Sequence, residues 1–280
     1  MYQCWKYNFE LVTLEKCPIV GENQSKDELF LSLPDGVYTV LRTVGKTKIF
    51  QFRYHLNRLS ESYYLSQGAF PCKIDKIRQP LFDTINEYPA QEIRIRIHIP
   101  FQLPCMVYLI LEELTTPEKY AYEQGVSVNT NKLSRKNPKV KLTSFTRQSE
   151  QLKKYCIENH LEDSIIINSE NKLLEGLSSN FFAVLLNKIY TADTDVLSGA
   201  TRDIILDEAR KANIEIQYTP IAYDQIGSID EAFISSTSRG LLPVVKIDNV
   251  QIGDGKPGRV SKFLLGRLNE RMLSESENII

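Results

Sequence analysis

Four short segments in the second half of the chain contain residue types that could do chemistry together. Lys141 supplies an amine, and Glu175 supplies a carboxylate at the start of Glu175-Gly176-Leu177-Ser178-Ser179-Asn180. Two runs of small residues, Gly199-Ala200-Thr201-Arg202 and Ser235-Ser236-Thr237-Ser238, offer amides and hydroxyls to an anion. An amine, a carboxylate and two anion cradles indicate a pocket for pyridoxal phosphate (PLP), which carries an aldehyde, a pyridine nitrogen and a phosphate.

Spacing alone does not show which lysine of this pattern would bind the aldehyde. A lysine that bonds a carbonyl cofactor needs a neutral amine, so it should be partly desolvated. Val140 and Leu142 give Lys141 apolar neighbours. Lys139 points the same way in a strand, so spacing does not choose between the two lysines. Taken alone, the segment Pro138–Thr143 favours two solvated lysines on one strand face.

Glu175 is the candidate partner of the pyridine nitrogen. A carboxylate there keeps the nitrogen protonated, and the protonated ring is a better electron sink. Gly176 lets the backbone come close to a flat ligand. The alternative is a surface turn with a solvated glutamate. The apolar run at 181–184 enters a buried strand and favours the functional interpretation.

Three features are candidates for the phosphate. Gly199 precedes a helix predicted over 201–212, so the amides of Ala200 and Thr201 would face an anion; a plain N-cap is the alternative. The hydroxyl run at 235–238 follows an apolar strand. Arg58, on a predicted helix, could bind phosphate with two donors, although most helical arginines are surface charges.

The elements that position these groups change in character along the chain. Residues 36–42 and 49–53 are predicted strands, 20–29 a polar loop, and 145–159 a helix. Residues 92–99 alternate strictly, so one strand face is apolar and the other carries Arg94, Arg96 and His98. We predict an α+β fold with a smaller N-terminal domain over 1–120. A larger, β-rich C-terminal domain with flanking helices is predicted over 121–280.

Composition limits the kind of protein. The 280 residues are 42% apolar and 25% charged, with a formal net charge of -1, so nothing indicates a nucleic-acid partner. We see no apolar run near the ~18 residues of a membrane span and no signal peptide at the N-terminus. Five scattered cysteines form no CxxC pair, and three distant histidines indicate no metal site. These features predict a cytoplasmic enzyme with free thiols.

Taken together, the motifs resemble the class IV aminotransferases, the PLP fold-type IV group. This group includes branched-chain aminotransferase, D-amino acid aminotransferase and aminodeoxychorismate lyase. The similarity runs from about Gly36 to Arg271. It rests on the following segments: Gly36-Val37-Tyr38, His55-Leu56-Asn57-Arg58-Leu59, Pro138-Lys139-Val140-Lys141, the Glu175–Asn180 run, the Leu197–Arg202 run, Ser236-Thr237 and Pro243-Val244.

The resemblance implies a role for each candidate. It selects Lys141 as the Schiff-base lysine and Glu175 as the pyridine partner. It implies a homodimer, and a site at the junction of the two domains of one subunit. The implied cofactor-binding residues are Arg58, Lys141, Glu175, Ser179, Asn180, Ala200, Thr201, Ser236, Thr237 and Ser238. The substrate-side candidates are Tyr38, Arg94, Arg96, His98 and Arg239.

The activity implied is transamination between an amino acid and a 2-oxo acid, with no metal. Lys141 would take the substrate Cα proton and return it to the cofactor's C4′ carbon. One alternative is a lyase on the same scaffold that forms 4-aminobenzoate and pyruvate, because the hydroxyl of Thr39 could assist elimination. Another is a non-catalytic binding protein, against which the presence of both Lys141 and Glu175 argues.

Overall fold

The computed structural model describes residues 2–18 and 26–280. They divide into two compact units. Unit 1 comprises residues 1–115, 140–147 and 272–280, and unit 2 comprises 116–139 and 148–271. We expected one division near residue 120, but two later segments join unit 1. Leu142 forms a bridge to Val37, and the strand Ser276–Asn278 pairs with Lys48–Phe50.

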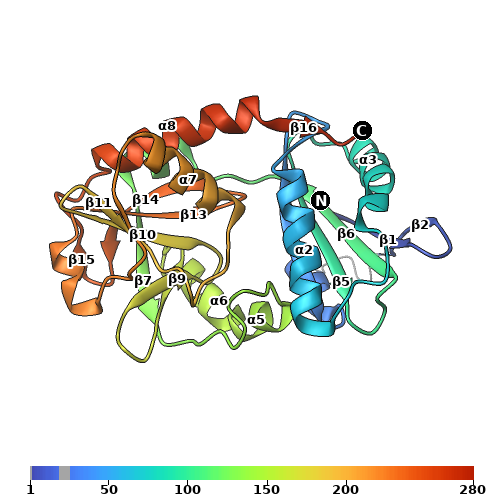
Figure 1. Cartoon of the computed structure of the whole chain (residues 1–280), viewed down its shortest axis with the longest axis horizontal. Coiled ribbons are helices and arrows are strands. Elements are labelled where there is room, and N and C mark those ends of the chain that lie inside the picture. Colours follow the sequence, from blue (N-terminus) through green and yellow to red (C-terminus); the bar gives the residue numbers. More distant parts are fainter. Residues whose placement is uncertain (1, 19–25) are drawn as a thin grey trace. The chain divides into compact units, whose positions relative to one another are not determined.

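Unit 1 is built on a seven-stranded antiparallel sheet with the order β16-β4-β3-β5-β6-β1-β2 (Figure 1). The strand predicted from strict alternation is present as β5, whose isoleucines at 93, 95, 97 and 99 are all buried on one face. The strands are β1 Tyr2–Asn8, β2 Thr13–Lys16, β3 Gly36–Val44, β4 Lys48–Phe50, β5 Ile93–Pro100, β6 Met106–Glu113 and β16 Ser276–Asn278.

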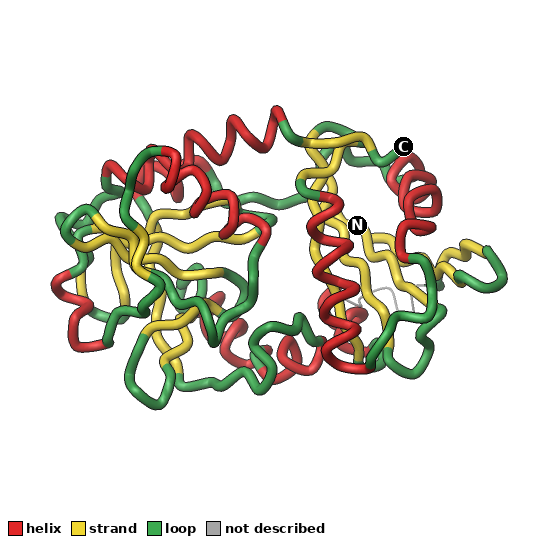
Figure 2. Tube along the Cα trace, viewed as in Figure 1, coloured by secondary structure: helices red, strands yellow, loops and turns green. Residues whose placement is uncertain are grey.

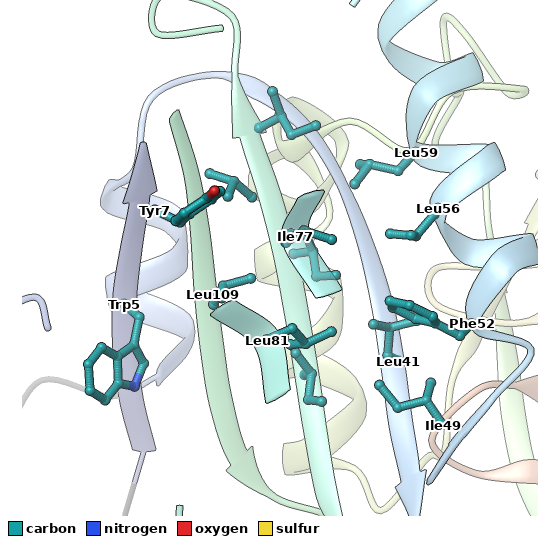
Figure 3. Close-up of a cluster of buried hydrophobic side chains, with 14 of the residues drawn as sticks. Trp5, Tyr7, Leu41, Ile49, Phe52, Leu56, Leu59, Ile77, Leu81 and Leu109 are labelled. Carbon is teal, nitrogen blue, oxygen red and sulfur yellow. The ribbon is translucent and has the colours of Figure 1, made fainter. Parts of the chain in front are cut away.

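Helices cover both faces of this sheet. On one face, α2 (Phe52–Gln67), the 3-10 turn η1 (Ile74–Ile77) and α3 (Arg78–Glu87) bury the main core. Figure 3 shows Phe52, Leu56 and Leu59 of α2 directed at the sheet. Burial of many such side chains stabilises the layer, at about 1.5–3 kcal/mol each.

The other face of the sheet is covered by α1 (Lys26–Ser32). Leu29 and Phe30 pack there against Cys4 and Ile110. The loop predicted over 20–29 is therefore wrong for residues 26–29, and residues 20–25 lie outside the described part. The polar composition hid a short apolar stripe, because Leu29 and Phe30 of the helix and Leu33 just after it belong to one buried cluster.

Unit 2 contains nine strands, drawn in yellow in Figure 2. Six of them, in the order β10-β13-β14-β7-β8-β9, close into a ring because β9 also pairs with β10. The strands are β7 Val126–Asn131, β8 Ser164–Ile167, β9 Leu173–Gly176, β10 Asn180–Leu185, β11 Lys188–Tyr190, β12 Ile216–Gln217, β13 Glu231–Ser236, β14 Gly240–Ile247 and β15 Val250–Gln251.

The single helix expected over 145–159 is divided in the structure. It forms two helices, and buried Ser149, with φ -90° and ψ 0°, lies between them. Within residues 2–18 and 26–280, no helix is long and apolar enough to span a membrane. The helices are α4 Lys119–Gln124, α5 Thr143–Gln148, α6 Glu150–Glu158, α7 Ala200–Lys211, the 3-10 helix η2 Tyr223–Ser228 and α8 Arg259–Ser274.

Candidate active site

Lys141 lies in unit 1 on a backbone that is fixed from two sides. Its carbonyl accepts a hydrogen bond from the Tyr38 amide at 3.0 Å, and its own amide donates to Ser62 Oγ of α2 at 3.5 Å. The ammonium nitrogen lies 5.1 Å from the centre of the Tyr38 ring. Lys139, in contrast, is exposed and donates to the Asp193 carbonyl in unit 2 at 2.6 Å. The two lysines thus occupy different environments, although residues two apart would face the same side of a strand.

Arg58 belongs to a buried polar group on the α2 side of β3. Its Nη2 donates to Thr39 Oγ1 at 3.0 Å, and Thr39 Oγ1 lies 3.0 Å from His55 Nδ1. Burial lowers the pKa of His55 well below its usual value, and the charges of Arg58 and Lys141 lower it further. The neutral imidazole accepts from Thr39, which accepts from Arg58. The Thr39 hydroxyl is therefore engaged in fixing the guanidinium.

The three basic candidates of β5 all lie on the sheet face that α1 covers. Arg94 forms an ion pair with Glu112. Arg96 donates to Asp27 Oδ1 at 2.8 Å, and its guanidinium lies 4.4 Å from the centre of the Phe30 ring. Burial and the neighbouring Arg96 lower the pKa of Arg94. Both side chains are thus held by partners in unit 1, and their substrate role stays a prediction.

His98 is fully buried in the same layer. Its ring lies 5.7 Å from that of Phe30, and its Nε2 is 3.1 Å from the Pro34 carbonyl oxygen. Burial lowers the pKa of His98 to about 4. The His98 ring is therefore neutral at pH 7 and donates to a carbonyl, and packing in unit 1 accounts for its position. The substrate role of His98 also stays a prediction.

Glu175 lies in unit 2 where the strand ring closes. It is the cross-strand partner of Asn180 in β10, and Asn180 is the partner of Ser235 in β13. Paired residues share a sheet face, so these three side chains form one row. Glu175 Oε2 accepts from the Leu197 amide at 3.0 Å, and Oε1 lies 3.4 Å from the Arg135 guanidinium. The carboxylate is buried, oriented and paired with a cation.

A second buried carboxylate, Asp163, organises the turn after Glu175. Its Oδ1 accepts from the Leu177 amide at 3.0 Å. Its Oδ2 accepts from the hydroxyls of Ser178 at 3.0 Å and Ser179 at 2.8 Å. A Cβ on Gly176 would lie 2.3 Å from Ser179 Oγ and 2.8 Å from Asp163 Oδ2. The turn is therefore built around Asp163, and it requires glycine at 176.

Arg239 also binds to this carboxylate. Its Nη2 donates to Asp163 Oδ2 at 3.0 Å and to Ser178 Oγ at 2.8 Å. Its Nη1 lies 3.0 Å from Glu162 Oε1, and its Nε donates to Ser236 Oγ at 3.1 Å. Burial lowers the Arg239 pKa, but the two carboxylates outweigh this effect and raise it above its usual value. Arg239 thus links the two serine-containing turns, and its substrate role stays a prediction.

The expected phosphate cradle begins at α7. Gly199 precedes the helix, and Ala200 and Thr201 occupy its first turn, where amides have no intrahelical acceptor. A Cβ on Gly199 would lie 2.2 Å from Asn180 Oδ1, while Asn180 Nδ2 donates to the Leu197 carbonyl at 2.8 Å. Asn180 thereby connects the Glu175 strand to this helix start. Ser236, Thr237 and Ser238 are half-buried at the end of β13.

Comparison with known proteins identifies the family. The family model for amino-transferase class IV matches residues 36–247. The chain belongs to the class IV aminotransferases. It is 24% identical to the branched-chain-amino-acid aminotransferase of Pseudomonas aeruginosa, over 82% of this chain and 81% of that one. It is also 24% identical to the D-alanine aminotransferase of Listeria monocytogenes, over 82% and 84%.

Solved structures support the same fold for this class IV aminotransferase. The Escherichia coli branched-chain amino acid aminotransferase superposes with a TM-score of 0.79 at 19% identity, covering 98% of this chain and 96% of that one. The T.th. branched-chain amino acid aminotransferase with pyridoxamine 5'-phosphate gives 0.78 at 21% identity, covering 98% and 94%. The predicted two-domain α+β fold of type IV is confirmed. Class IV aminotransferases depend on PLP, which confirms the predicted cofactor.

The residues of this class IV aminotransferase fit PLP. Ser235 Oγ is buried and has no hydrogen-bond partner within residues 2–18 and 26–280, although its row contains Glu175 and Asn180. Buried hydroxyls in native proteins are normally bonded, so this one is available for a ligand. Gly199 leaves the start of α7 without a side chain. These features suit an anionic, polar ligand on that face.

Sequence reasoning missed four residues of this machinery. Arg135 and Asp163 lie 40 and 12 residues before Glu175, outside the Glu175–Asn180 motif, and no local motif marks them. Ser235 was seen as part of the hydroxyl run but was not named as a ligand. His55 lies three residues before Arg58, so its position on the same helix face was the one available signal.

Proposed function

We propose that Lys141 of this class IV aminotransferase forms the covalent Schiff-base link to PLP. The supporting observation is the fixed backbone of Lys141, bonded to β3 at Tyr38 and to α2 at Ser62. Arg58 lies on the same helix one turn before Ser62. A rigid support of this kind keeps a reacting amine near its target while its covalent partner changes. Exposed Lys139 has no comparable support.

With PLP bound, the Lys141 amine would take the proton from the substrate Cα as general base and return it to the C4′ carbon as general acid. Bound PLP supplies an electron sink for the electrons left when the Cα–H bond breaks. Glu175 keeps the pyridine nitrogen protonated, because its carboxylate is buried and oriented by the Leu197 amide. The Arg135 guanidinium lies 3.4 Å from that carboxylate and compensates its charge.

Arg58, the first amides of α7 and the Ser236–Ser238 turn bind the phosphate. Thr39 and His55 hold the guanidinium of Arg58 in one orientation. Because the Thr39 hydroxyl is engaged in this way, it does not favour the lyase alternative.

The proposed transferase reaction uses an amino acid and a 2-oxo acid, and Tyr38 lies beside the substrate. A screen of L- and D-amino acids against pyruvate and 2-oxoglutarate would define the donor.

Trapping the covalent link tests the central assignment. The PLP-loaded protein is reduced with borohydride, cut with trypsin and analysed by mass spectrometry. We expect a pyridoxyl group on Lys141, none in Lys141→Ala, and an unchanged adduct in the matched control Lys139→Ala. Loss of the adduct in Lys139→Ala with retention in Lys141→Ala would refute the assignment.

The homodimer and the cytoplasmic location implied by the family are further parts of the proposal. Free thiols at all five cysteines support a reducing compartment. Light scattering of the purified protein should give about twice the mass of 32.2 kDa for one chain. Cell fractionation should recover the activity with other cytoplasmic enzymes; a monomer, or activity in the membrane fraction, would contradict these two points.

A further inference from the structure

Two cysteines of unit 1 lie side by side although they are far apart in the sequence. Cys72 follows α2, and Cys105 lies in the turn between β5 and β6. Their sulfur atoms are 3.2 Å apart. Both residues are half-buried, so small solutes reach this pair from solvent. No role in the aminotransferase reaction accounts for this arrangement.

The two segments that carry the pair are fixed by packing. The Phe9 amide donates to the Cys105 carbonyl at 2.9 Å, which attaches the turn to the end of β1. On the other side, the ring of Phe70 lies 5.8 Å from that of Phe9 and 5.1 Å from that of Tyr63. Phe70 precedes Cys72 by two residues, so the same aromatic cluster holds both sulfur-bearing segments. Their proximity is therefore a property of the folded unit.

We propose that Cys72 and Cys105 form a site of reversible oxidation to a disulfide, with hydrogen peroxide as the oxidant. One thiolate attacks the peroxide, so an S–O bond forms, the O–O bond breaks and water leaves after protonation. The second sulfur then displaces the hydroxyl, so the S–S bond forms, the S–O bond breaks and a second water leaves. The two thiols lose two electrons in total, and hydrogen peroxide gains them.

The required movement is small. A disulfide bond is about 2.05 Å long, so the sulfurs must approach by roughly 1 Å. Rotation about the Cα–Cβ bonds of the two cysteines moves the sulfur atoms by such a distance and leaves the aromatic cluster closed. An external dithiol reverses the reaction by thiol–disulfide exchange.

The other cysteines provide internal comparisons. Cys4 and Cys17 are also neighbours, since the Cys17 amide donates to the Cys4 carbonyl at 2.8 Å. Cys4, however, is 2% exposed and lies under α1. Cys156 is buried, with its sulfur 3.8 Å from Asn129 Oδ1. A bridge requires access to both sulfurs, and Cys72 and Cys105 are two neighbouring cysteines of which neither is buried.

The experiment counts thiols and maps the bridge in the PLP-loaded protein. After mild hydrogen peroxide treatment and denaturation, reactive thiols should fall from five to three and return to five with dithiothreitol. Non-reducing tryptic mapping should join the peptides 59–73 and 97–119, which carry these two cysteines. The bridge should also raise the unfolding temperature by roughly 5–10 °C, because it closes a long loop of the unfolded chain.

Three variants make the test decisive. Cys72→Ser and Cys105→Ser should each keep all four remaining thiols under the same treatment. The matched double variant Cys4→Ser/Cys17→Ser should still lose two of its three. Peptide mapping of the unmodified chain decides the matter even if a variant fails to fold. Five retained thiols, or a bridge that joins any other pair, would overturn the proposal. Because the readout is thiol chemistry, it is independent of whether Lys141 binds PLP.

Discussion

Ser235 offers a prediction in which stability and cofactor binding should respond in different ways to one substitution. The side chain is 2% exposed, and its hydroxyl has no hydrogen-bond partner in the part of the chain that the structure describes. It stands in the same row as Asn180 and Glu175. We infer that the missing partner is the cofactor, so Ser235→Ala should weaken PLP binding without destabilising the PLP-free form.

The size of each effect of Ser235→Ala follows from the interactions lost in the PLP-free and PLP-bound forms. Without PLP, the substitution removes a buried and unsatisfied hydroxyl, whose burial costs about 1–3 kcal/mol. The free energy of unfolding of the PLP-free protein should therefore stay the same or rise by about 1 kcal/mol. With PLP, a hydrogen bond to a charged oxygen is lost, worth about 1.5–3 kcal/mol. The dissociation constant for PLP should then rise roughly 10- to 100-fold.

Two titrations measure these effects. Urea unfolding followed by circular dichroism gives the stability of the PLP-free protein, and an absorbance titration gives PLP affinity. Ser179→Ala is the matched control, because its hydroxyl donates to Asp163 at 2.8 Å and its loss should destabilise the PLP-free protein. Repeating the titration with pyridoxal shows whether Ser235 contacts the phosphate. A Ser235→Ala protein that is destabilised by more than about 1 kcal/mol yet binds PLP normally would refute the reasoning.

Three other substitutions test the packing around the site. Between pH 6.5 and about 4, unfolded His98 binds a proton that the folded residue does not, so stability should fall with decreasing pH. This part of the loss, about 3 kcal/mol, should be absent from His98→Gln in urea titrations at pH 7 and pH 4. Asp163→Asn should lower the free energy of unfolding by about 3 kcal/mol, because it removes the buried charge that pairs with half-buried Arg239 and that accepts from Ser178 and Ser179. The more exposed control, Glu162→Gln, should cost about 1 kcal/mol, and an equal loss in both variants would contradict the role of Asp163. Gly199→Ala should weaken PLP binding at least tenfold, because its Cβ would lie 2.2 Å from Asn180 Oδ1; normal affinity in an absorbance titration would show that the α7 start tolerates a side chain.

The parts of the site that could be predicted from the sequence are those encoded over a few residues. Gly199 before α7 is a local signal, because the turn and the helix start share one short segment. Strict alternation likewise predicted β5 and assigned its isoleucines to one face. In both cases the physical cause, a turn or a side-chain period, lies within the segment itself.

What covers the other face of β5 could not be predicted from the sequence. Alternation placed Arg94, Arg96 and His98 together but gave no information about what covers them. The cover is α1, whose Phe30 packs near Arg96 and His98. Its sequence begins with polar residues, and the apolar stripe is short. A local pattern therefore assigned these side chains to a face without revealing that the face is enclosed by a helix.

Arg239 makes the same point in unit 2. Its position after the hydroxyl run indicates a residue near the phosphate, and a free guanidinium there would suit a substrate carboxylate. Its donors instead bind Glu162, Asp163 and Ser178, all of which lie at least 60 residues earlier in the chain. Buried guanidinium groups require such acceptors, and a sequence does not say which distant carboxylates supply them. The turn after Glu175 and the turn before Arg239 therefore depend on one ion pair between buried Asp163 and half-buried Arg239, so a change in either turn should alter the stability of the other.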